Sequence, residues 1–138
     1  MSWLHWSLLS ALFAGLTAVL AKIGTKDIDA NVATAFRTLV VLPIAAGLAW
    51  WTHTQPLQSI SSATWGWLAL SGVATSASWL CYFQALKIGE ASKVAPVDKL
   101  SVVVAMVLAV VVLGEVVTLR QVAGGLLILA GAVLIAWK

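Results

Sequence analysis

Five long runs of apolar residues, separated by short polar stretches, make up almost the whole chain. A transmembrane helix needs about 20 mostly apolar residues, and each run is close to that length. The expected helices cover residues 3–23, 32–51, 65–88, 95–113 and 118–137. Because the connections are short, we expect consecutive helices to pack as antiparallel neighbours. The pattern predicts an all-α integral membrane protein with five transmembrane helices in one domain, residues 1–138.

Start and stop signals support several of these boundaries. Thr118 and Gln121 fit a capping box, in which each side chain bonds a backbone N–H group of the other residue. Gly114 can end the preceding helix in a left-handed conformation. In the polar linker before the third helix, Ser61 and Ser62 can cap that helix. These signals place the fifth helix most firmly.

The start of the fourth helix has two interpretations. If Pro96 is the first helical residue, it occupies a favoured position, and Asp98 stabilises the first turn through the helix dipole. If the helix begins earlier, near Ser92, then Pro96 breaks a backbone hydrogen bond inside the membrane. Asp98 and Lys99 would then be buried beside Arg37.

Composition points to lipid as the solvent. Hydrophobic residues form 62% of the 138 residues and charged residues 9%, whereas soluble domains carry about 25% charged residues. Cys81 is the single cysteine, and His5 and His53 are far apart, so we expect no disulfide and no metal site. There is no phosphate loop or nucleophile motif, so we expect neither an enzyme nor a cofactor. The basic residues are scattered singly, which argues against nucleic acid.

The charges also indicate an orientation. One predicted face carries almost all the lysines and the other carries only Arg120. Short loops rich in Lys and Arg stay in the cytoplasm, so we expect the N-terminus outside and the C-terminus in the cytoplasm. The lysines concerned are Lys22, Lys26, Lys87, Lys93 and Lys138. A belt of tryptophans on the opposite face agrees: Trp3, Trp6, Trp50, Trp51, Trp65 and Trp67.

Arg37 is the clearest candidate for a functional charge, because ionisable groups at membrane depth are costly. One interpretation is that it extends to the cytoplasmic headgroups. The other is that it faces the protein interior, with Asp98 as its partner and Lys22 and Lys99 nearby. Three cations to one anion would favour an anionic or carboxylate-bearing ligand, although lipid headgroups would satisfy the same charges.

Two further groups of residues are candidates for contacts. Trp79 lies well inside the third helix, where it either fills space between helices or forms the wall of a substrate cavity together with Tyr82. Gly124, Gly125 and Gly131 let backbones approach closely, either within the chain or in a dimer.

Several segments resemble the EamA domain of the drug/metabolite transporter superfamily. They are FQALKIGEASKVAPVDKL at residues 83–100, Leu113-Gly114-Glu115, GGLLILAG at residues 124–131, and Ala35-Phe36-Arg37. The resemblance implies secondary transport of a small metabolite or drug, without ATP hydrolysis, in a bacterial or archaeal cytoplasmic membrane. Typical members have two inverted five-helix halves. This chain resembles one half, which implies a homodimer or a pairing with another five-helix half-unit.

The related small multidrug resistance proteins use a carboxylate in their first helix to exchange protons for cationic drugs. Alignment on Lys22 puts that position near Ala14, and this chain has no acidic residue in its first helix. That route of cation export is therefore not expected here. A non-transporting membrane subunit that packs on another complex is the alternative function.

Overall fold

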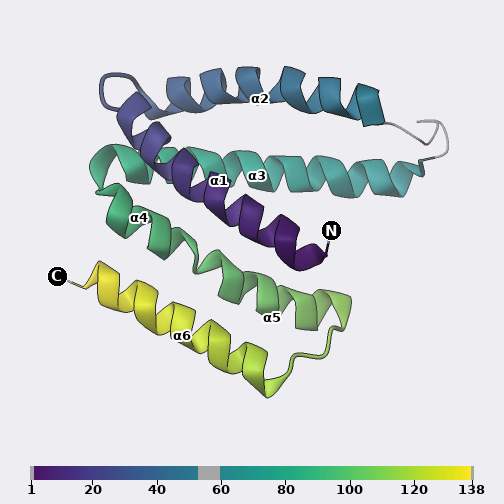
Figure 1. Cartoon of the computed structure of the whole chain (residues 1–138). Coiled ribbons are helices and arrows are strands. Elements are labelled where there is room, and N and C mark those ends of the chain that lie inside the picture. The colour runs from purple at the N-terminus through teal and green to yellow at the C-terminus, as the bar shows by residue number, and fades with distance from the viewer. Residues whose placement is uncertain (1, 53–59, 138) are drawn as a thin grey trace. The chain divides into compact units, whose positions relative to one another are not determined.

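The computed structural model describes residues 2–52 and 60–137, and over these residues the chain is helical with short connections (Figure 1). The expected all-α class is confirmed. The helices are α1 (Trp3–Gly24), α2 (Ala30–Thr52), α3 (Ser62–Ile88), α4 (Ala91–Asp98), α5 (Ser101–Leu113) and α6 (Leu119–Ala136). Most of the predicted polar linker, with His53 and Pro56, lies outside the described residues, as does Lys138.

Four helical segments of the described residues are long and apolar enough to cross a membrane: Trp3–Gly24, Ala30–Thr52, Ala91–Leu113 and Leu119–Ala136. They correspond to four of the five expected spans, with α4 and α5 forming one of them. The remaining helix, α3, has 27 residues, ample length for a span, but it is less apolar. Its sequence interleaves serine, threonine and tryptophan with aliphatic residues. A membrane crossing by α3 stays a prediction.

The local signals in the sequence form the expected caps. Both hydrogen bonds of the capping box join Thr118 and Gln121 at the start of α6. Gly114 ends α5 with a φ of 68°, in the left-handed region. The N–H of Thr64 donates to Ser61 Oγ at 3.1 Å, which caps α3. These elements are determined by residues close in the sequence.

Two helix starts differ from the expectation. The N–H of Asn31 donates to Asp29 Oδ1 at 2.8 Å, so α2 begins at Ala30, two residues earlier than expected. The fourth helix begins at Ala91, and Pro96 lies inside it. The interpretation that placed Pro96 at the first helical position is therefore wrong, and the earlier start holds.

The predicted fourth helix is divided into α4 and α5. Pro96 has no N–H to donate to the carbonyl of Ser92, which removes one bond from the helix. At the division, the N–H of Lys99 donates to the Pro96 carbonyl at 3.1 Å and that of Leu100 to the Val97 carbonyl at 3.0 Å. Bonds to the third preceding residue are the 3₁₀ pattern, which tightens the turn.

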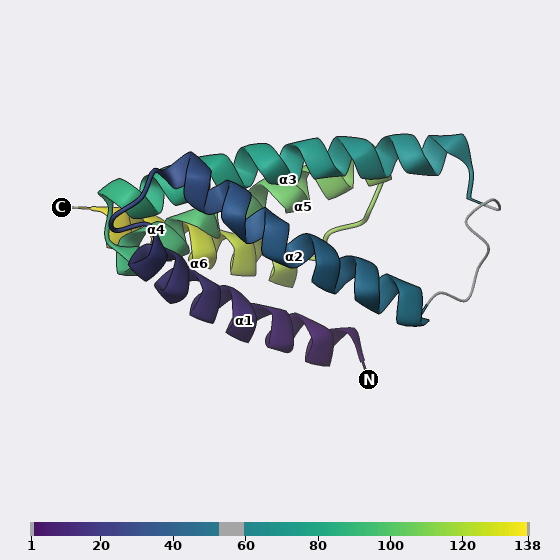
Figure 2. The same cartoon turned by 90° about the horizontal axis from the view of Figure 1, so that it is seen from above.

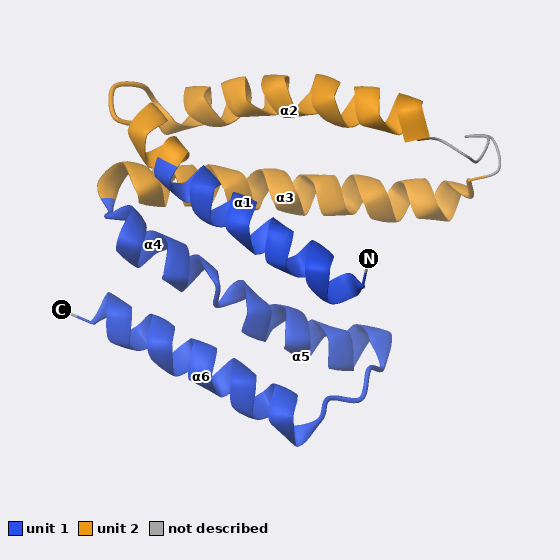
Figure 3. Cartoon of the chain, in the orientation of Figure 1, with its two compact units in different colours: residues 1–19, 89–138 blue, residues 20–88 orange. Residues whose placement is uncertain are grey.

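The chain forms two compact units (Figure 3). Unit 1 comprises Met1–Val19 and Gly89–Lys138, in which α6 packs on α4 and α5. Unit 2 comprises Leu20–Ile88, in which α2 and α3 lie side by side (Figures 1 and 2).

Candidate functional site

The contact between α2 and α3 in unit 2 pairs small residues with large ones. Ala30, Ala33 and Thr34 are buried on one face of α2. Phe83 of α3 packs against Ala30 and Ala33 and is 3% exposed. Small side chains let the α2 backbone approach the phenylalanine ring closely, which maximises the van der Waals contacts that hold helices together in lipid.

Arg37 continues the buried face of α2 by one turn and lies against α3. Its Cζ is 4.3 Å from the centre of the Trp79 ring and 5.6 Å from that of Phe83. Both distances are within the range of cation–π attraction. Because α2 begins at Ala30, Arg37 is about 10 Å along the helix, deeper than the sequence suggested.

The other predicted aromatic residue, Tyr82, lies in the same region of unit 2. Its ring makes an edge contact with Phe83, with 6.5 Å between ring centres and 68° between planes. Tyr82 is half-buried and packs against the core formed by Ala30, Ala33 and Phe83. The structure thus brings together three of the predicted site residues: Arg37, Trp79 and Tyr82.

The packing of α2 on α3 ends at Arg37 and Trp79. Beyond them, residues 38–52 of α2 and residues 62–78 of α3 are exposed. Figure 2 shows the two helices diverging in that direction. The guanidinium group therefore lies at the open end of a helix–helix contact.

The remaining predicted charges have other partners. Asp98 forms an ion pair with Lys99, with 3.3 Å between Oδ2 and Nζ. Both belong to unit 1, whereas Arg37 belongs to unit 2. Within unit 2, Arg37 forms no ion pair and no hydrogen bond through its side chain among the described residues. A pair between Arg37 and Asp98 stays a prediction.

Lys22 has a role that sequence reasoning missed. Its Nζ donates to the carbonyl of Leu86 at 2.6 Å and to that of Lys87 at 3.5 Å. These carbonyls belong to the last turn of α3, where no helical N–H can reach them. A cation at a helix C-terminus is also favoured by the helix dipole. Lys22 therefore acts as a cap on α3, and Lys87 reciprocates by donating to the Ile28 carbonyl at 2.9 Å.

Replacing Lys22 with methionine should destabilise unit 2 by about 1–3 kcal/mol, because it removes a charged hydrogen bond from a helix end. Thermal unfolding in detergent would measure the loss. The matched control is Lys26→Met, since Lys26 lies exposed in the following turn. Equal melting temperatures for the two variants would contradict the capping role.

The glycines of α6 lie in different surroundings. A Cβ built on Gly125 would be 3.2 Å from Met106 Sδ, so Gly125 makes room for a contact between α5 and α6. Cβ atoms on Gly124 and Gly131 would have no such neighbour within 4 Å. Of these three glycines, Gly125 is thus the one at which α5 and α6 approach closely.

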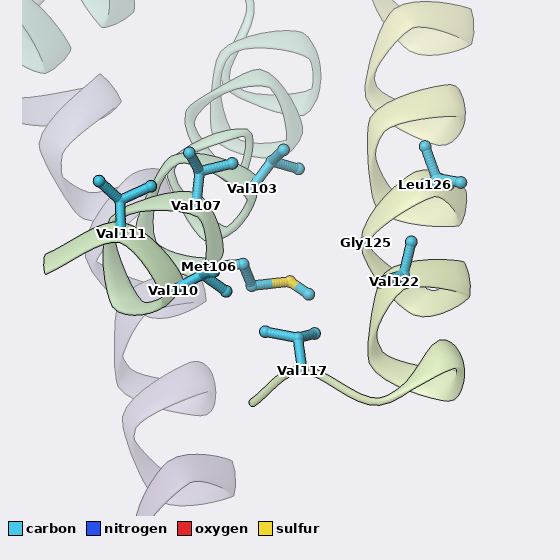
Figure 4. A pocket seen from close by; sticks show the side chains of 9 residues that line it. All are labelled: Val103, Met106, Val107, Val110, Val111, Val117, Val122, Gly125 and Leu126. Atoms are coloured by element: carbon cyan, nitrogen blue, oxygen red, sulfur yellow. The ribbon is translucent and has the colours of Figure 1, made fainter. Parts of the chain in front are cut away.

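An apolar groove of about 290 Å³ lies beside this contact in unit 1 (Figure 4). Figure 4 shows Met106 extending from α5 toward α6. The lining residues are Val103, Met106, Val107, Val110, Val111, Val117, Val122, Gly125 and Leu126. Ligand sites normally include a few polar groups that orient the ligand, and these side chains supply none. The Arg37 region of unit 2 is therefore the better candidate site.

No group of three or more His, Cys, Asp or Glu side chains that could hold a metal ion is found among residues 2–52 and 60–137. Cys81 is exposed on α3 and is a free thiol.

Comparison with known proteins identifies relatives of this chain. The sequence model of the EamA-like transporter family matches residues 1–137. A protein from Sinorhizobium sp, named "Uncharacterized transporter in cobO 3'region", is 49% identical over 136 residues, which are 98% of this chain and 96% of that protein. No solved structure matches the chain.

Proposed function

We propose that this chain, which belongs to the EamA-like transporter family, is a secondary transporter of a small metabolite or drug. The chain is a multi-pass membrane protein and a transporter in the general sense of its family. The proposal adds that transport needs no ATP hydrolysis and takes place across a bacterial or archaeal cytoplasmic membrane. It also adds that residues 1–138 form one five-helix half-unit, which works as a homodimer or with another half-unit.

The substrate site is assigned from the contact of Arg37 with the Trp79 ring. A guanidinium group about 10 Å along a helix of membrane-spanning length is costly in lipid and is therefore a candidate for function. In this proposal Arg37, Trp79 and Tyr82 contact the substrate from unit 2. Asp98 and Lys99 of unit 1, which the sequence also suggests as substrate contacts, stay separate predictions.

Solute exchange in proteoliposomes tests the transport activity without a known substrate. Vesicles containing the purified protein are loaded with an isotopically labelled extract of small metabolites and placed in the unlabelled extract, without ATP. Mass spectrometry then identifies the compounds that exchange. At least one compound should exchange faster than in protein-free vesicles. No protein-dependent exchange would favour the alternative, a non-transporting membrane subunit.

We expect the turn between α1 and α2 to face the cytoplasm and the turn between α5 and α6 to face outside, from the distribution of lysines. Single cysteines at Asp27 and Val116, in a Cys81→Ala background, report these two positions. A membrane-impermeant thiol reagent added to intact cells should label the Val116→Cys variant and leave the Asp27→Cys variant unlabelled. Labelling of both would show insertion in both orientations, which an inverted homodimer requires.

We expect Gly131 to lie at a contact between two copies of the chain. Leucine at this position would push a facing backbone away, so Gly131→Leu should shift the protein toward monomer in mild detergent. Gly125→Leu is the comparison, because it clashes with Met106 and should lower the melting temperature by overpacking, without monomerising the protein. A Gly131→Leu variant that dimerises fully would contradict the interchain contact.

A further inference from the structure

We infer that Arg37 binds an anionic group, a carboxylate or a phosphate, at the open end of the α2–α3 contact. The inference rests on the proposed function and names the chemical class of its substrate. The residues that support it all belong to unit 2.

The contact with Trp79 leaves the N–H donors of Arg37 unused within the described part of unit 2. The guanidinium carbon of Arg37 lies over the Trp79 ring, 4.3 Å from its centre, so the positive charge meets the face of the ring. The five N–H donors of arginine lie in the plane of the group and point outward from its edge. Among the described residues of unit 2, none of them donates a hydrogen bond and none meets a carboxylate. The aromatic rings thus stabilise the positive charge of Arg37, and its N–H donors stay available for hydrogen bonds to a ligand.

The acidic residues of unit 2 lie away from Arg37. They are Asp27 and Asp29, both in the turn before α2. Asp29 is used at the first turn of α2, where it accepts from the N–H of Asn31 at 2.8 Å and from that of Val32 at 3.4 Å. Arg37 lies about two turns further along the helix. The unit therefore supplies a cation at this position and holds its own carboxylates elsewhere.

The position and the shape of the guanidinium group both suit an anionic ligand. Residues of α2 and α3 beyond Arg37 and Trp79 are exposed, so within unit 2 the two helices do not close over the guanidinium group on that side. The planar edge of a guanidinium group matches the two oxygens of a carboxylate or phosphate in a bidentate pair. Such a pair compensates the charge of Arg37 at membrane depth, where compensation is worth most.

The same geometry disfavours a cationic ligand. Trp79 and Phe83 could attract a cation through their ring faces, but the guanidinium group already lies over both rings. A second cation beside it would be repelled. The acidic residues of unit 2, Asp27 and Asp29, lie in the turn before α2, about two helical turns from Arg37, and do not offset this repulsion. An anion is therefore the charge that the site accepts.

The anionic group has two possible sources, a dissolved small molecule or the phosphate of a lipid headgroup, and one experiment distinguishes them. Purified protein in dodecyl maltoside, which carries no phosphate, is titrated with benzoate and with inorganic phosphate, and the melting temperature is recorded. In parallel, protein in nanodiscs of phosphatidylglycerol is compared with protein in nanodiscs of a phosphate-free galactolipid. Each measurement includes Arg37→Gln, Arg37→Lys and the control Arg120→Gln, which removes an arginine from the exposed start of α6.

A dissolved ligand should stabilise the parent and the Arg120→Gln control equally. Arg37→Gln should weaken the response about tenfold or more, as expected for the loss of a charged hydrogen bond. Arg37→Lys keeps the charge and loses the bidentate geometry, so it should retain part of the response and remain informative if the glutamine variant does not fold. Stabilisation by phosphatidylglycerol alone, with the same dependence on Arg37, would support the anion site and identify the headgroup as its occupant.

The inference is overturned if neither the dissolved anions nor phosphatidylglycerol gives a response that depends on Arg37. It is also overturned if the cation tetraphenylphosphonium stabilises the parent through Trp79 while the anions do not. Anion binding that depends on Arg37, combined with no exchange in proteoliposomes, would keep the site and count against the proposed function. Exchange that continues in Arg37→Gln would support the proposed function and count against the anion site at Arg37.

Discussion

Replacing Phe83 with alanine is expected to destabilise the protein by about 3–5 kcal/mol, the usual cost of removing a buried aromatic side chain. Phe83 is 3% exposed and packs with Ala30 and Ala33 in the core of unit 2. The alanines on α2 have no long side chains that could move into the space. The lost ring also removes one of the two aromatic contacts of Arg37. Thermal and denaturant unfolding in detergent would measure the effect.

The control for this prediction is Phe36→Ala. Phe36 is on α2 beside Arg37 in the sequence, but it is 66% exposed. The chemical change is identical, and detergent or lipid can fill the space around an exposed ring. We therefore expect a loss of stability well below that of Phe83→Ala. If the two variants lose stability equally, the α2–α3 contact does not hold unit 2 together as described.

The sequence predicted most of the local structure, because the signals for it act over a few residues. The capping box of Thr118 and Gln121 and the left-handed Gly114 depend on neighbouring backbone groups alone. The predicted start of α2 is two residues too late, because the apolar run begins at Val32 whereas Asp29 caps the helix from the polar stretch before it. Such an error has a consequence for the site, since it moves Arg37 deeper along its helix.

The partners of the charged residues were harder to predict, because they come from distant parts of the chain. Lys22 donates to a carbonyl that lies 64 residues away, and no side-chain pattern marks a carbonyl as an acceptor. For Arg37 the sequence suggests Asp98 as a partner, because opposite charges are easy to identify in a sequence, and this pair stays a prediction. In unit 2 its partners are the faces of Trp79 and Phe83, whose attraction for a cation comes from the ring quadrupole and not from a formal charge.

The start of the fourth predicted helix was also not determined by the sequence. Proline is favoured in the first turn of a helix and tolerated inside one at the cost of a hydrogen bond, so Pro96 fitted both interpretations. The structure has the earlier start, at Ala91, and a tightened turn after Asp98. The residues around Pro96 fit both starts and therefore do not decide between them.

Replacing Arg37 with glutamine is expected to lower transport by about tenfold to a hundredfold, because the substrate loses a charged, bidentate partner at the α2–α3 contact. Stability should change less than in Phe83→Ala, since the core of Ala30, Ala33 and Phe83 is left intact. Arg37→Lys should lie between the parent and the glutamine variant, because a lysine keeps the charge but not the planar fork.

The most direct test of the account is the exchange rate of the compound identified in proteoliposomes, measured for the parent, Arg37→Gln and the Arg120→Gln control at equal protein content. The account predicts that exchange continues without ATP in the parent and the control and falls at least tenfold in Arg37→Gln, while that variant keeps a cooperative unfolding transition. Exchange by a folded Arg37→Gln protein at the parent rate would contradict the assignment of Arg37 to the substrate site.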